Sequence, residues 1–187
     1  MTKTSIKALR DEKYLGCPGT TLDDSMLADI GRIFANYGLL VFRIREFVTY
    51  AASHSNRYPL SIGSKDAIRL FPSVLEVLKP AFPGEERHTL NRALENFAAA
   101  KQYLDQSLYC TWGVISRNED GTQKVARTEY RRYKNFGTSL DRTEFSRTTL
   151  YSVALEIQRT ISYVGDVFAM LEQKITDEPD FVRKILN

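Results

Sequence analysis

The sequence has few of the residues that build metal and redox sites. It contains two cysteines, Cys17 and Cys110, and two histidines, His54 and His88, all far apart along the chain. No pair of them has the spacing of zinc ligands, and no glycine-rich phosphate loop is present. We therefore expect no metal ion and no cofactor.

The chain also lacks long apolar runs and a strong charge of one sign. No stretch approaches 18 apolar residues, and the N-terminus has no apolar core of the signal-peptide type. The formal net charge of +3 does not by itself indicate binding to nucleic acid or membrane. We expect a cytoplasmic protein with two reduced thiols.

The length and composition are those of one globular domain. The 187 residues are enough to bury a core, and the 43% hydrophobic and 26% charged shares are ordinary for a soluble protein. Residues 1–20 are charged and then rich in turn formers, which predicts a flexible N-terminal arm. Residues 21–187 then form a single helical-bundle domain.

Four stretches place apolar residues at the three- and four-residue steps of an amphipathic helix: residues 23–54, 65–79, 85–110 and 143–174. In the first, Gly31 and Gly38 lie close to one face. Each costs about 1 kcal/mol relative to alanine, so we expect another helix to approach closely there. Pro72 predicts that the second helix is kinked or split. Asp141 or Thr143 is the expected cap of the last helix.

A small β-hairpin is expected between the last two long helices. Residues 112–117 and 122–128 have the composition of short strands, and Asn118-Glu119-Asp120-Gly121 is a suitable loop between them. We expect residues 129–142 to be irregular or partly extended. Three long helices, one broken helix and a hairpin near residues 112–128 predict an all-α fold, an antiparallel four-helix bundle.

At LYCTWGVISRNEDG, residues 108–121, the chain resembles the HEPN-like proteins, a superfamily of small all-α domains. The resemblance extends to the order of elements over residues 23–175. It implies a homodimer in which an Arg and a His from two subunits meet and cleave RNA. Such a histidine supplies acid–base chemistry near neutral pH, and the arginine stabilises phosphate charge.

The residues of that ribonuclease motif are absent from this chain. Counted from Trp112 and Gly113, the family's Arg, Asn and His fall near Leu104, Asp105 and Tyr109. The resemblance therefore implies a degenerate member without the usual nuclease activity, and we assign no catalytic residue.

Two groups of residues are candidate sites. The first is a polar and aromatic cluster at the end of the third long helix, which is either a pocket or dimer seam or a plug that closes the bundle: Lys101, Asp105, Tyr109 and Trp112. The second is basic, with tyrosines interleaved, and suits an anion or nucleic acid: Arg117, Arg127, Arg131, Arg132 and Lys134. Alternatively, the basic segment 127–147 is a connector whose arginines pair with the bundle's own carboxylates.

Three functions follow from these features. The first is a non-catalytic HEPN-like interaction domain that forms a homodimer, because apolar stripes this long and broad leave surface that a partner buries. The second is an RNA-binding or RNA-cleaving protein with unusual site residues. The third is a small-molecule-binding bundle with its ligand near Trp112.

Overall fold

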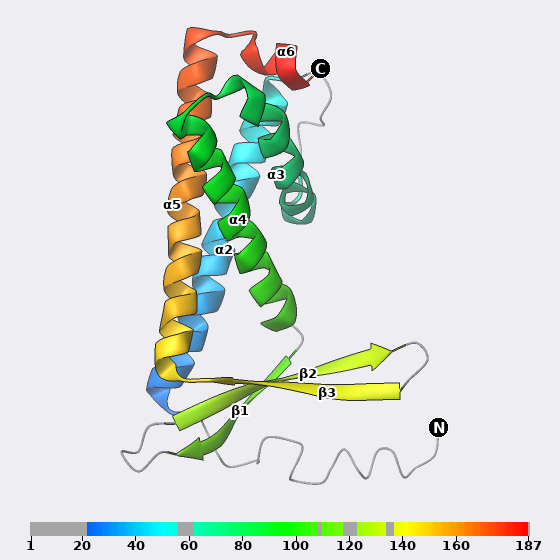
Figure 1. Ribbon diagram of the computed structural model, residues 1–187, viewed down its shortest axis with the longest axis vertical. Helices are drawn as coiled ribbons and strands as arrows, with labels where there is room; N and C mark the ends of the chain where they lie inside the picture. Colours follow the sequence, from blue (N-terminus) through cyan, green and yellow to red (C-terminus); the bar gives the residue numbers. More distant parts are fainter. Residues whose placement is uncertain (1–21, 56–61, 108–109, 118–122, 134–136, 187) are drawn as a thin grey trace. The chain divides into compact units, whose positions relative to one another are not determined.

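The computed structural model describes residues 22–55, 62–107, 110–117, 123–133 and 137–186 (Figure 1). The helices are α2 (Asp24–Ser53), α3 (Ser64–Leu78), α4 (Glu85–Ser107), α5 (Arg147–Asp177) and α6 (Phe181–Leu186), with a 3-10 turn, η1 (Lys79–Ala81), after α3. The predicted arm over residues 1–20 lies outside the described residues.

The predicted helical-bundle class is confirmed, with two corrections to its helices. α3 continues through Pro72 as one helix, so it is not split there. α5 begins at Arg147 rather than near residue 143, and neither Asp141 nor Thr143 caps it because both belong to a strand. The cap is Ser146, whose side-chain oxygen accepts the backbone N–H of Thr149 at 3.1 Å.

The predicted hairpin is present and belongs to a larger sheet. The strands β1 (Cys110–Arg117), β2 (Gln123–Tyr133) and β3 (Gly137–Phe145) form an antiparallel sheet in the order β1-β2-β3. The expectation of irregular backbone over residues 129–142 was therefore wrong. β3 has little apolar alternation, so the backbone ladder to β2 defines a strand that the side-chain pattern does not mark. The predicted loop 118–121 lies outside the described residues.

The described chain divides into two compact units. One contains residues from 1–33 and 102–154, including the sheet, and the other contains residues from 34–101 and 155–187. α2, α4 and α5 each contribute residues to both units. The single domain expected over residues 21–187 stays a prediction.

Aromatic residues build the core of the helical unit. Phe47 of α2 and Phe71 of α3 are fully buried and meet edge to face, with ring centroids 5.6 Å apart. Phe47 also contacts Phe168 of α5, and Phe71 contacts Phe97 of α4. Phe82, which follows η1, and Phe181, the first residue of α6, make a similar edge-to-face pair. These contacts place α2, α3, α4 and α5 around one apolar centre.

The sheet unit has its own small core. Val125 of β2 and Leu150 of α5 are fully buried, and Phe145 of β3 is nearly so. The Phe145 ring meets Tyr103 of α4 edge to face, with centroids 6.0 Å apart. Residues paired in register at this end of the sheet, Val125 and Phe145, therefore join the helices' apolar stripes.

Candidate functional site

The predicted polar and aromatic cluster is only partly within the described structure. Lys101 and Asp105 lie on α4, and the Lys101 side chain is partly exposed. Trp112 lies on β1, and Tyr109 lies outside the described residues. The side chains of Asp105 and Trp112 also lie outside the description, so the pocket or dimer seam proposed for this cluster stays a prediction.

The sheet arranges most of the basic candidates along two strands. Arg127, Arg131 and Arg132 lie on β2, and Arg117 ends β1 opposite Gln123. Lys134 lies outside the described residues. The register places Trp112 directly opposite Arg127. The backbone register therefore sets one residue of each predicted group opposite the other on neighbouring strands, which the sequence periodicity did not predict.

Asp29 of α2 is a buried acid that sequence analysis missed. The residue is 3% exposed, and its carboxylate accepts hydrogen bonds from Arg32 at 2.6 Å and from Arg147 at 3.2 Å. Its position between Met26 and Ile33, on the apolar stripe, was the signal in the sequence. For Arg147 the connector alternative therefore holds, because this arginine joins the start of α5 to α2.

The N-terminus of α2 is capped by Asp23. Its carboxylate accepts the Ser25 hydroxyl at 2.6 Å and the backbone N–H of Met26 at 2.8 Å. These two hydrogen bonds, with the Ser25 bond the larger cause, lower the pKa of the Asp23 carboxyl below its usual value. The predicted boundary of this helix is thus fixed by a side-chain cap.

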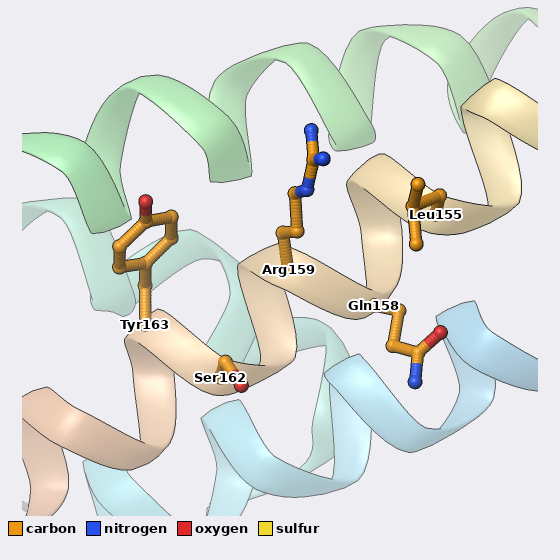
Figure 2. A pocket seen from close by; sticks show the side chains of 5 residues that line it. All are labelled: Leu155, Gln158, Arg159, Ser162 and Tyr163. Carbon is orange, nitrogen blue, oxygen red and sulfur yellow. The ribbon is translucent and has the colours of Figure 1, made fainter.

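A hollow of about 420 Å³ lies beside α5 in the helical unit (Figure 2). The residues that line it come from two turns of that helix: Leu155, Gln158, Arg159, Ser162 and Tyr163. Figure 2 shows Arg159 and Tyr163 extending toward α4, in green, and Gln158 extending in a different direction. Arg159 is already paired with Glu156 at 2.5 Å. All of these lining residues belong to α5, so the hollow offers polar contacts along a single helix.

The two histidines lie at the ends of different helices. His54 follows α2, and its Nδ1 lies 2.9 Å from the carbonyl oxygen of Tyr50. Burial, and then the charge of Glu172, raises the pKa of the Tyr50 hydroxyl. His88 is exposed in the first turn of α4. Within the described residues, no cluster of three or more His, Cys, Asp or Glu side chains is arranged to hold a metal ion.

The most prominent candidate site is an exposed apolar face on α2. Six large hydrophobic residues are exposed in the described structure, and four of them lie on this helix: Leu27 (50% exposed), Phe34 (36%), Leu39 (46%) and Phe42 (44%). The opposite side of the helix is buried, with Ile33, Leu40 and Ile44 at 1% exposure or less. α2 is therefore apolar on two sides, and among the described residues only one of these sides is covered.

The two glycines of α2 belong to this exposed face. Gly31 and Gly38 are both exposed. A Cβ added at either would find no heavy atom within 4 Å, apart from its chain neighbours and the helix's own backbone. The close helix approach that we expected there is thus not made by any described part of the same chain.

Comparisons with known proteins add no relative. No protein-family model, curated protein or solved structure matches the chain. Within the described part of the chain, every helix is too short or too polar to span a bilayer.

Proposed function

We propose that this chain is a cytoplasmic, non-catalytic interaction domain of HEPN-like type that works as a homodimer. The exposed apolar face of α2 carries the proposal. Contiguous apolar surface on a soluble protein usually marks a place where another molecule binds. The order of elements, with a hairpin between the last two long helices, supports the HEPN-like assignment.

The exposed apolar face supplies part of the free energy that a moderately stable dimer needs. Complete burial of a Leu or Phe side chain stabilises by about 1.5–3 kcal/mol, so four half-exposed side chains retain about 3–6 kcal/mol per chain. Two chains then gain about 6–12 kcal/mol. Association costs about 4–15 kcal/mol in lost motion, so further contacts must contribute, and a dissociation constant in the micromolar range is expected.

Replacing one apolar residue of the face tests the proposal. Phe34→Asp puts a charge in the middle of the apolar face, and we expect light scattering after size exclusion to change from dimer to monomer. Val77→Asp is the matched control, because Val77 is 42% exposed but lies on α3. A dimer that survives Phe34→Asp, or that Val77→Asp disrupts equally, would contradict a role for the α2 face.

RNA binding by the sheet is the second candidate, favoured by one observation. The register sets Trp112 opposite Arg127, with Arg131 and Arg132 further along β2. Aromatic and basic groups together bind single-stranded nucleic acid by stacking and by phosphate pairing.

Measured affinity separates this candidate from the first. If the sheet binds RNA, affinity for a single-stranded oligonucleotide falls as salt rises, and Arg131→Ala with Arg132→Ala weakens it at least tenfold. Affinity that is independent of salt, or unchanged in the double variant, would exclude the sheet as an RNA site. Cleavage by the wild-type chain would instead support the catalytic alternative, with Tyr109→Phe as the informative variant.

A further inference from the structure

We infer that the partner bound by the α2 face is a second copy of the same chain, whose α2 lies antiparallel to the first. This inference rests on the proposed homodimer and specifies its geometry. The twofold axis passes between Phe34 and Ala35. The arrangement follows from the order of exposed residues along one continuous helix (Figure 1), so it depends on α2 alone.

Leu39 lies to one side of the proposed contact, and eight other exposed residues between Asp24 and Arg45 share one strip of the α2 face. At 100° per residue they fall within an arc of about 100°. In chain order they are Asp24, Leu27, Gly31, Phe34, Ala35, Gly38, Phe42 and Arg45, and all are exposed. Large apolar, small and charged residues therefore succeed one another on a single strip of surface.

The kinds of residue are arranged symmetrically about the midpoint of the strip, with opposite charges at the two ends, then Leu27 and Phe42, then the two glycines, and Phe34 beside Ala35 at the centre. Each residue has a counterpart at the same distance from the midpoint between Phe34 and Ala35. An isologous twofold contact requires such self-complementarity, because each residue of one copy meets its counterpart on the other. In the antiparallel pair, Leu27 lies level with Phe42 of the partner subunit, and Gly31 lies level with Gly38 of the partner subunit.

The charges at the two ends favour the antiparallel direction. An antiparallel pair brings Asp24 of one copy beside Arg45 of the partner subunit, twice in each dimer. A parallel pair would bring like charges together at both ends, which is unfavourable. Neither residue has an ion pair among the described residues, whereas Arg32 is paired with Asp29 and Arg43 with Glu46. The guanidinium carbon of Arg45 lies over the ring of Phe42, 5.7 Å from the ring centroid, and this cation–π contact keeps Arg45 at the edge of the face.

The glycines explain how the two helices come close. The distance between packed helices depends on the side chains at the contact. Gly31 and Gly38 have open space around them in the single chain, and in the antiparallel pair they oppose each other on either side of the axis. Two helix backbones therefore meet where no side chain separates them, and Leu27 and Phe42 pack beyond each glycine.

Cysteine pairing tests the direction of the two helices. In a background carrying Cys17→Ser and Cys110→Ser, Leu27→Cys and Phe42→Cys chains, which add no bulk at the glycines, are oxidised separately and as an equal mixture. We expect disulfide-linked dimers to form at least tenfold faster in the mixture than in either chain alone, because only unlike positions are level. Faster linkage of each chain alone would indicate a parallel pair and overturn the inference.

The oligomeric state of the same cysteine variants, measured before oxidation, distinguishes the two levels of the proposal. If the chains are dimeric but no sample forms cross-links, the dimer uses another surface. That result would contradict the antiparallel α2 contact and still agree with a homodimer. If the cysteine variants and the wild-type chain are all monomeric at 100 µM, both the antiparallel contact and the homodimer are contradicted. Another segment or another protein then covers the face.

Charge exchange gives an independent readout that needs no cysteine. We expect Asp24→Arg and Arg45→Asp, each alone, to weaken the dimer roughly tenfold, and the two changes in one chain to restore it. Arg69→Asp on α3, where Arg69 is 78% exposed, is the control and should change nothing. Failure of the double variant to restore dimerisation contradicts the antiparallel contact.

Discussion

The two glycines of α2 allow a prediction in which folding and dimerisation change in opposite directions. An added Cβ at Gly31 or Gly38 meets nothing within 4 Å in the single chain, so alanine fits at both positions. Glycine in a helix interior is about 0.8–1.0 kcal/mol less favourable than alanine. Gly31→Ala with Gly38→Ala should therefore raise the free energy of unfolding of the monomer by about 2 kcal/mol.

The same two changes should weaken the dimer. Each methyl group enters the place where the two backbones are closest, and overpacking of this kind costs about 1–3 kcal/mol at each site. The double variant should therefore have a dimer dissociation constant at least tenfold above that of the wild-type chain. A glycine that costs stability in the monomer is then explained by the contact that it permits between copies.

Two measurements and one control decide the outcome. Urea unfolding is monitored by circular dichroism at protein concentrations below the dimer dissociation constant, and it gives the monomer's free energy of unfolding. Sedimentation velocity at higher protein concentrations gives the dimer dissociation constant. The control is Gly165→Ala on α5, where an added Cβ also meets nothing within 4 Å. It should stabilise the monomer by about 1 kcal/mol and leave the dimer unchanged.

The reasoning can fail in two separate ways. A double variant that unfolds more easily as a monomer would show that the α2 face is covered within the chain. A double variant that is stabilised and still forms a wild-type dimer would show that the glycines lie outside the contact between copies.

Two further predictions concern the sheet unit. Asp23→Ala removes the cap of α2 and should cost about 0.5–2 kcal/mol in urea unfolding. Because hydrogen bonds, chiefly from Ser25, lower the pKa of Asp23 below its usual 3.8, the wild-type advantage is complete above that pH. It should disappear as pH falls through the lowered pKa, and an advantage that persists in acid would be contrary to this account. Asp29→Ala should cost about 1–3 kcal/mol, because the two arginines it leaves are half-exposed. Asp66→Ala breaks an exposed ion pair and should cost under about 0.5 kcal/mol. Equal losses of stability in Asp29→Ala and Asp66→Ala would refute the claim that the burial of Asp29 makes its ion pairs more important.

The helices were predictable because their apolar residues repeat with the helical period. The stripe that includes Met26, Ile33 and Leu40 defines α2 to within a residue at each end. The unusual glycines, Gly31 and Gly38, led us to expect from the sequence that another helix approaches closely. No described part of the chain makes this approach at either glycine, which the sequence alone could not indicate.

Features that depend on pairing between distant residues were less predictable. β3 is held by the backbone ladder to β2, and its residues lack the alternation that marks a half-buried strand. Asp29 and Arg147 are 118 positions apart, so no local period relates them. The positions of Trp112 and Arg127 opposite each other likewise depend on the register of β1 against β2.

Sedimentation equilibrium of the unmodified chain from 1 to 100 µM tests the central claim most directly. If the α2 face binds a second copy, the weight-average mass rises from 21.4 kDa toward twice that value as concentration increases. A mass that stays at 21.4 kDa over the whole range would contradict the homodimer.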